Sequence, residues 1–262
     1  MNLKLSSYMK HLLILLGFIC MCCVVYAQDS KPKSKATTKP TVITKPPAAA
    51  KPMTRTTTSS VTTDSNYGSV TDIDGNVYKT VKIGNQIWMA ENLKTSHYND
   101  GTQIPNITDG NKWVYLTTGA YCYYDNEYKN NTIYGKLYNW YAVNTGKLAP
   151  KGWHIPTDAE WLILTTFLGG ETIAGGKMKS TKYWKLPNIG ATNNSGFNCL
   201  PAGYRTHIYG LYNSIGYCCY FWSTTEGNIY PAWYRSLRNT NSNTIRDLDN
   251  KESGYSVRCI KD

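Results

Sequence analysis

The segment Gly152-Trp153-His154-Ile155-Pro156-Thr157-Asp158-Ala159-Glu160-Trp161 decides the fold, because it specifies in chemical detail how one helix begins. Thr157 is predicted to be the N-cap. Its hydroxyl accepts a hydrogen bond from the backbone N–H of Glu160, and the Glu160 carboxylate accepts one from the N–H of Thr157, which together form a capping box. Asp158 adds negative charge at the positive end of the helix dipole.

The same helix is predicted to continue to Leu168. Four apolar residues recur at helical spacing and form the face that we expect in the core: Trp161, Leu164, Phe167 and Leu168. Gly169-Gly170 follows, and glycine readily adopts the left-handed conformation that ends helices. The pattern therefore predicts one amphipathic helix packed against the rest of the domain.

The first 27 residues have the composition of a secretory signal peptide. Two lysines and a histidine precede an apolar run at residues 12–25, which closes on Val25-Tyr26-Ala27, a small-residue cleavage pattern. The run is shorter than the roughly 20 apolar residues that a membrane span needs. Lipidation at Cys20, Cys22 or Cys23 is the less favoured alternative, because no small residue precedes any of them. We expect cleavage near Ala27, a secreted or cell-surface location, and no transmembrane span in the mature protein.

Residues 28–66 are predicted to form a disordered tether. The segment is rich in lysine, proline and threonine and nearly lacks large apolar side chains, so it buries too little surface to offset the entropy of ordering. Seven basic residues against two aspartates give it a net charge of +5, out of +11 for the whole chain. We expect electrostatic association with an anionic envelope or polysaccharide surface. Glycosylation of its Ser/Thr-Pro tracts is an open alternative to a plain spacer.

Residues 67–262 are predicted to form one globular domain. Their 19 basic and 15 acidic residues leave a net charge of only +4, whereas a nucleic-acid-binding face needs clustered basic charge on the domain, so we expect no nucleic-acid partner. Turn signals at residues 74–75 and 84–85 join three predicted strands into a meander. Val77, Val81 and Ile83 are expected to face the core from the second strand.

The rest of the domain mixes short helices and strands. Tyr134, Leu137, Tyr138 and Tyr141 recur at helical spacing and predict a short helix. After the capped helix, short apolar stretches between Gly, Asn and Ser predict strands at residues 197–200, 217–223, 232–237 and 255–260. This order of elements is typical of the α+β class.

Seven stretches of the domain carry a family resemblance, and they are 70–76 (VTDIDGN), 87–93 (IWMAENL), 134–143, 152–161, 200–205 (LPAGYR), 222–226 (WSTTE) and 254–259 (GYSVRC). In this order they resemble the Fibrobacter succinogenes major paralogous domain, also called FISUMP, a family of exported bacterial domains. The resemblance implies a C-type-lectin-like or formylglycine-generating-enzyme-like fold, in which a helix of the Pro-Thr-Asp-Ala-Glu-Trp kind packs on a twisted, loop-rich antiparallel sheet. It implies no particular activity.

Five cysteines remain after the predicted cleavage, and they are Cys122, Cys199, Cys218, Cys219 and Cys259. In an oxidising compartment they allow two disulfides and one free thiol. The FISUMP resemblance implies a cysteine where this chain has Ala149, paired with the residue that matches Cys259, so Cys122 becomes the alternative partner of Cys259. Cys199 is expected to pair with either Cys218 or Cys219, since adjacent residues of a strand point to opposite faces.

No catalytic residue, metal ion or cofactor is predicted. His97, His154 and His207 lie in separate motifs without the spacing of a zinc site. The chain has neither a Gly-x-Ser-x-Gly nor a Cys-x-x-Cys motif, which removes the simplest hydrolase and thioredoxin-like interpretations. The enzyme alternative is a formylglycine-generator-like scaffold, which would place Cys218 or Cys219 beside His207 in a cleft.

A recognition surface is the favoured function. The domain holds all eight tryptophans and 20 of the 22 tyrosines, side chains that provide rigid, amphipathic contact area. The candidate ligand-binding residues are Tyr123, Tyr124, Tyr209, Tyr212 and Tyr220. The residues expected to serve the scaffold are Thr157, Glu160, Trp88, Trp140, Trp153, Trp161, Trp222 and Arg258. We expect an exported, non-catalytic domain that binds glycan or an envelope or surface protein, with a purely structural envelope component as a further alternative.

Overall fold

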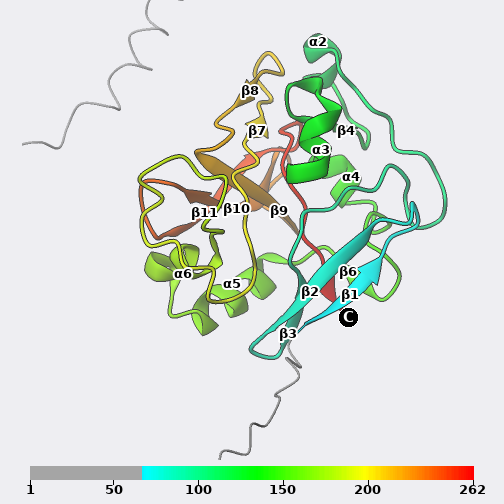
Figure 1. Cartoon of the computed structure of the whole chain (residues 1–262). Helices are drawn as coiled ribbons and strands as arrows, with labels where there is room; N and C mark the ends of the chain where they lie inside the picture. Colours follow the sequence, from blue (N-terminus) through cyan, green and yellow to red (C-terminus); the bar gives the residue numbers. More distant parts are fainter. Residues whose placement is uncertain (1–66) are drawn as a thin grey trace, which may run out of the picture. The chain divides into compact units, whose positions relative to one another are not determined.

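The computed structural model describes residues 67–262, so the predicted signal peptide (1–27) and tether (28–66) lie outside the described residues. The described part contains a five-stranded sheet, a three-stranded sheet, two strand pairs and a few short helices (Figure 1). The predicted α+β class is therefore confirmed. No helix between residues 67 and 262 is both long enough and apolar enough to cross a membrane.

The five-stranded sheet contains the predicted meander. Its strands, in spatial order, are β1 (Tyr67–Thr71), β2 (Val77–Ile83), β3 (Gln86–Met89), β12 (Ile260–Lys261) and β6 (Trp153–His154). Neighbouring strands are antiparallel. Gly75 and Gly84 adopt φ angles of 80° and 60° at the two turns, a conformation that glycine reaches without a steric penalty.

The second sheet is also antiparallel and has the order β11-β10-β9. Its strands are β9 (Cys218–Glu226), β10 (Pro231–Arg238) and β11 (Thr244–Asn250). Two short pairs complete the strands, namely β4 (Tyr121–Cys122) with β5 (Leu137–Tyr138), and β7 (Tyr204–Arg205) with β8 (Tyr212–Asn213).

The helices are short and lie between the strands. They are α2 (Gly110–Trp113), the 3-10 turn η1 (Tyr124–Asn126), α3 (Tyr128–Tyr134), α4 (Trp140–Val143), α5 (Asp158–Phe167) and α6 (Glu171–Met178). In Figure 1, α5 and α6 lie beside the β9–β11 sheet, whereas α2, β7 and β8 lie together at the other end of the domain.

The predicted helix through Tyr134 and Tyr141 is wrong. Helix α3 ends at Tyr134 because Gly135 adopts φ 75°, and a Cβ at that position would lie only 2.8 Å from Asn92. The next residues form β5, which pairs with β4. The four residues at helical spacing thus belong to three elements, α3, β5 and α4, and not to one helical face.

The expected inward face of β2 needs a correction. Val77 is 63% exposed, although Val81 and Ile83 are buried as expected. Tyr78 is buried instead, and its hydroxyl donates to the Asp72 carboxylate at 2.5 Å. At the start of β2, the face that carries Tyr78 is therefore the one that lies toward the core, and Val77 faces outward.

Two predicted strands are largely absent from the described residues. Residues 197–200 form no strand, and Cys199 makes a single bridge to Lys179. Of residues 255–260, only Ile260 belongs to a strand, and the others run as an extended segment with isolated bridges. Both stretches lie in the core without continuous strand pairing.

Helix α5 begins as the sequence indicates. The Thr157 hydroxyl accepts from the N–H of Glu160 at 3.2 Å, and the Glu160 carboxylate accepts from the N–H of Thr157 at 2.8 Å. The Asp158 carboxylate forms ion pairs with the guanidinium groups of Arg235 and Arg246, with N···O distances of 2.7 Å and 2.9 Å. The first turn of α5 is therefore tied to strands β10 and β11 as well as to itself.

The inner face of α5 packs on an aromatic core. The Trp161 ring is fully buried, with its centroid 4.8 Å from Trp88 and 5.6 Å from Phe221. Phe167, however, is 63% exposed, so its predicted place in the core is wrong. At about 100° of rotation per residue, six residues place Phe167 about 120° around the helix from Trp161.

Most of the expected scaffold residues are enclosed. Those with at most 2% exposure are Trp88, Trp140, Trp161, Trp222 and Arg258, whereas Trp153 is half-buried. The Arg258 guanidinium donates to the carbonyls of Met89 and Phe197 and to the side chain of Asn92. Burial lowers the pKa of Arg258 to about 10. These contacts join the end of the chain to the first sheet.

Candidate functional site

The structure brings three of the five candidate tyrosines together. Tyr209 and Tyr212 line one hollow, and the ring of Tyr124 packs on Tyr212 with centroids 5.3 Å apart. Tyr123 lies elsewhere, at 5.7 Å from Tyr121. Tyr220 is buried in a stack on the β9–β10 sheet, 4.9 Å from Tyr255.

The hollow around Tyr209 and Tyr212, here called the β7–β8 hollow, has a volume of about 550 Å³. It is lined by Thr108, Gly110, Asn111, Asp125, Arg205, Tyr209, Gly210, Leu211, Tyr212 and Asn213. These residues come from the start of α2, from η1 and from the β7–β8 hairpin. The β7–β8 hairpin, about 80–105 residues later in the chain, thus meets the other two segments at one end of the domain (Figure 1).

A buried cation holds these segments in place. Arg205 is 1% exposed and donates to the backbone carbonyls of Ile107 at 2.6 Å, Thr108 at 2.8 Å and Gly210 at 2.9 Å. Its guanidinium lies 4.9 Å from the centre of the Tyr212 ring. A cation against an aromatic face in a desolvated position is attracted to the ring. Arg205 therefore fixes the floor of the hollow.

Backbone conformations that are rare for residues with side chains surround the same hollow. Asp125, Asn126, Tyr209 and Ser214 have φ angles of 53°, 56°, 59° and 65°. Asparagine and aspartate tolerate this region, but it is uncommon for a bulky residue such as tyrosine. Such residues cluster at sites where the surrounding structure enforces a functional geometry.

Several polar groups in the hollow are free to bind a ligand. The side chains of Asn111, Asp125, Tyr209 and Asn213 make no hydrogen bond or ion pair with any other residue in the range 67–262. The Tyr209 ring is 70% exposed. Desolvation, followed by the nearby Glu127 carboxylate, raises the pKa of Asp125. One carboxylate, two amides and one phenol ring are thus presented together.

The sequence prediction missed Asn111, Asp125 and Asn213. Asp125 and Asn213 are next to positions with unusual backbone conformation, at Asn126 and Ser214. The dipeptides Asp-Asn and Asn-Ser are typical of turns, and this was the one available signal. This signal predicts a turn, but it does not show which turns lie next to one another in the folded domain.

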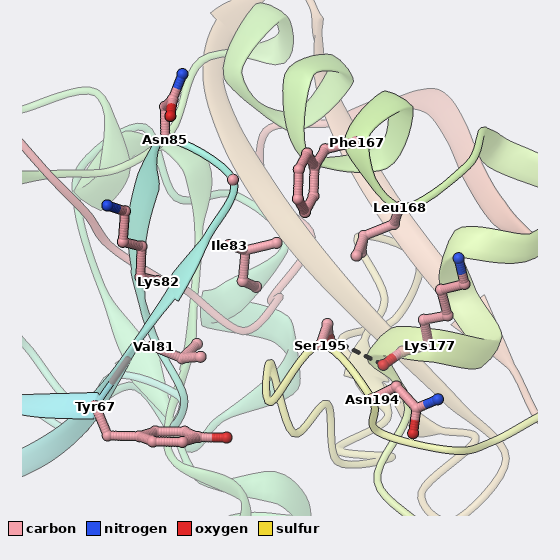
Figure 2. A pocket seen from close by; sticks show the side chains of 11 residues that line it. Tyr67, Val81, Lys82, Ile83, Asn85, Phe167, Leu168, Lys177, Asn194 and Ser195 are labelled. Carbon is pink, nitrogen blue, oxygen red and sulfur yellow. Dashed lines mark hydrogen bonds between the residues drawn. The ribbon is translucent and has the colours of Figure 1, made fainter. Parts of the chain in front are cut away.

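A larger hollow, of about 730 Å³, lies at the opposite end of the domain and is shown in Figure 2. This β2–α5 hollow is lined by Tyr67, Val81, Lys82, Ile83, Gly84, Asn85, Phe167, Leu168, Lys177, Asn194 and Ser195. In Figure 2 the side chains of Val81 and Ile83 point into it, whereas Lys82 points away.

The β2–α5 hollow has a mixed lining. Val81, Ile83 and Leu168 lie between Phe167 and Tyr67, and the polar lining residues are Lys82, Asn85, Lys177, Asn194 and Ser195 (Figure 2). The Ser195 hydroxyl donates to the backbone carbonyl of Lys177 at 2.9 Å, so it is already engaged. None of the five candidate tyrosines lines this hollow, whereas Tyr209 and Tyr212 line the β7–β8 hollow. We therefore take the smaller β7–β8 hollow as the candidate site.

The arrangement expected for the enzyme alternative is not formed by the described residues. Cys219 is fully buried, and burial, followed by its contact with Cys199, raises its pKa well above the usual value. A reactive cysteine needs the opposite, an accessible thiolate. His207 contacts Ser253 at 3.2 Å and Asp249 at 3.4 Å, and neither Cys218 nor Cys219 is its partner.

The contacts of His207 do not build a nucleophilic triad either. The Ser253 hydroxyl donates to Asp249 at 2.7 Å, and Nδ1 of His207 faces both of these residues. A triad requires the two ring nitrogens to have separate partners. Within residues 67–262, no three His, Cys, Asp or Glu side chains are grouped to hold a metal ion.

Comparison with known proteins gave one match. The family model described as the Fibrobacter succinogenes major domain matches residues 81–261, which is well over half of the chain. No curated protein and no solved structure matches the chain.

Proposed function

The chain belongs to the Fibrobacter succinogenes major domain family, and from this premise we propose that its folded part is an exported, non-catalytic recognition domain that binds glycan in the β7–β8 hollow. Two features of the sequence support export, namely the signal-like residues 1–27 and the basic tether-like segment that follows. Helix α5 packed beside a twisted antiparallel sheet supports a C-type-lectin-like fold.

One observation carries the proposal, which is the convergence of free polar groups beside an exposed ring. The Asp125 carboxylate accepts hydrogen bonds from sugar hydroxyls, while the amides of Asn111 and Asn213 both donate and accept. The Tyr209 ring, 70% exposed, offers an apolar face for the C–H surface of a pyranose. This combination suits a polyhydroxylated ligand better than an apolar protein surface.

The geometry favours recognition of one or two sugar residues and not a long chain. A volume of about 550 Å³ lies within the range of small-ligand sites. The carbonyls of Ile107, Thr108 and Gly210 are held by Arg205, so the walls are built before a ligand arrives. Pre-organised sites lose less entropy on binding.

A glycan array probed with the full chain tests the proposal, followed by titration calorimetry on the best ligand. Tyr209→Ala and the isosteric Asp125→Asn should each weaken binding by roughly tenfold or more, which corresponds to about 1.4 kcal/mol. Tyr230→Ala is the matched control, because Tyr230 is 75% exposed and lies outside the hollow. It should leave the affinity unchanged.

Three outcomes would contradict glycan recognition at this site. Silence of the array together with capture of one envelope protein would favour the surface-protein alternative. Silence in both assays would favour a purely structural envelope component. Glycan binding that is equally strong in the Tyr209 and Asp125 variants would place the site elsewhere, with the β2–α5 hollow as the next to test.

A further inference from the structure

Two thiols face one another in the core beneath the β9–β10 sheet. The Sγ atoms of Cys199 and Cys219 lie 2.7 Å apart, and both side chains are fully buried. Unbonded sulfur atoms ordinarily pack farther apart than this, whereas a disulfide joins them at about 2.05 Å. A small approach of the two side chains is all that separates this pair from a covalent bond.

Surrounding contacts hold both thiols in this position. The backbone of Cys199 forms an isolated β-bridge with the backbone of Lys179, and the Cys199 carbonyl accepts a hydrogen bond from the Trp184 indole N–H at 3.0 Å. Cys219 lies within β9, in register with Leu237 of β10. The two cysteines therefore approach each other from a fixed loop and a central part of the sheet.

The strand geometry selects Cys219 over its neighbour Cys218. Side chains alternate along a strand, and Cys218, which is half-buried, is on the other face, in register with Arg238. Cys122 and Cys259, the other expected pair, are buried in separate core clusters. Among the five cysteines of residues 67–262, the facing pair is Cys199 with Cys219.

We propose that Cys199 and Cys219 form a disulfide in the exported protein. The two thiols form one S–S bond and release two protons and two electrons. The electrons reduce the disulfide of an exchange partner to two thiols, and this partner is a thiol–disulfide oxidoreductase in the cell or oxidised glutathione in the test tube. The bond links the segment after α6 to β9, across a separation of 20 residues.

The burial of the pair also determines when the bond forms. Attack on the partner disulfide requires a thiolate, and burial raises the pKa of Cys219. The exchange therefore precedes the packing of α6 and β9 around the pair. Once the domain has folded, the cross-link is shielded from soluble reductants.

Peptide mapping tests the proposal directly. The mature chain, folded with oxidised glutathione, is alkylated and digested with trypsin without reduction. Cleavage after Lys185, Arg205 and Arg235 separates the two cysteines, so we expect residues 186–205 linked to residues 206–235, and an intact mass lower by two hydrogens. Recovery of both peptides unlinked and alkylated would overturn the proposal.

Cys218 lies on the same peptide as Cys219, so a variant has to tell them apart. Cys218→Ala should keep the cross-link, and Cys219→Ala should remove it. Loss of the cross-link in Cys218→Ala would overturn the assignment even if Cys219→Ala fails to fold. Because the folded pair is shielded, Cys218→Ala is first unfolded and reduced, and is then refolded in the presence of a reductant. Its Tm should be roughly 6–12 °C lower than that of the oxidised Cys218→Ala protein, whereas an unchanged Tm would contradict a stabilising bond.

Discussion

At the scale of single residues, the domain depends on buried cations that are bound by backbone carbonyls. Lys179 is fully buried, and its ammonium group donates to the carbonyls of Ile189 at 2.8 Å, Arg238 at 2.9 Å and Asn241 at 2.8 Å. Burial lowers its pKa, yet all three of its donors are satisfied. Lys179 thus fastens the end of α6 to two loops and to β10.

Replacing Lys179 with methionine should destabilise the domain strongly. Methionine has a similar volume, but it leaves three buried carbonyl groups without a donor. We expect a loss of about 2–4 kcal/mol in the free energy of unfolding, measured by guanidinium unfolding. Lys177→Met is the matched control, because Lys177 lies in the last turn of α6, two residues before Lys179, and is half-buried. It should change stability by less than about 0.5 kcal/mol. Equal losses in both variants would show that the carbonyl contacts of Lys179 carry little weight.

Residues of this kind have no signature in the sequence. A buried lysine or arginine reads like any surface cation, since its partners are backbone carbonyls from distant segments. Arg258 was expected to serve the scaffold, whereas Lys179 and Arg205 were not predicted, although Arg205 also lies in a family-like stretch, residues 200–205. Their roles appear only when the loops around them are in place.

At the scale of elements, helix α5 is the best-specified part of the fold. Its first turn is held by the capping box, by Asp158 with its two arginines, and by the Thr225 hydroxyl, which accepts from the N–H of Asp158 at 2.9 Å. Its core contact is the Trp161 ring between Trp88 and Phe221. The cap and the ring stabilise α5 by different amounts, because only the ring excludes a large apolar area from water.

A series of alanine variants along α5 should separate these contributions. Thr157→Ala should cost about 1 kcal/mol through loss of the cap, and Trp161→Ala roughly 3–5 kcal/mol through the cavity that it leaves. Phe167→Ala should change stability by no more than about 0.5 kcal/mol, because that ring is 63% exposed. Urea unfolding of the three variants provides the comparison. A Trp161 variant no less stable than the Thr157 variant would contradict the role assigned to the indole.

Elements with local signals could be predicted, and those set by packing could not. The α5 cap and the turns at Gly75 and Gly84 depend on neighbours in sequence. Helix α6 contains Gly175 and Gly176, which disfavour helix, yet a Cβ at Gly175 would lie 2.3 Å from the Asn243 carbonyl. The close approach of that loop requires glycine there. Strand β11 carries three charged residues, Arg246, Asp247 and Asp249, as edge strands often do, and its β-propensity gave no signal.

At the scale of the whole molecule, the candidate site joins residues 108–111 and Asp125 to residues 205–213, which come about 80–105 residues later in the chain. Composition indicated aromatic recognition and pointed to Tyr209 and Tyr212, but neither Asp125 nor the two asparagines followed from any local pattern. Their convergence depends on Arg205 and on the pairing of β7 with β8. The sequence thus named two tyrosines that line the hollow, whereas the polar residues that lie beside them could be identified only from the fold.

The net charge of the chain is divided unequally between the segment of residues 28–66 and the folded domain, and this division leads to a prediction. Residues 28–66 carry a net charge of +5, more than the +4 of residues 67–262. Compared with residues 28–262, a chain shortened to residues 67–262 should keep its Tm within about 1 °C, because residues 28–66 are nearly devoid of large apolar side chains. Retention on anionic vesicles should fall sharply in the shortened chain. In the chain of residues 28–262, retention should be strong near 0.01 M salt and weak at 0.15 M, since the Debye length drops from about 30 to about 8 Å. Calorimetry and vesicle co-sedimentation measure both effects. A lower Tm in the shortened chain would indicate that residues 28–66 contribute to the folded unit. Equal retention of both chains would indicate that the charge that binds the vesicles lies in residues 67–262.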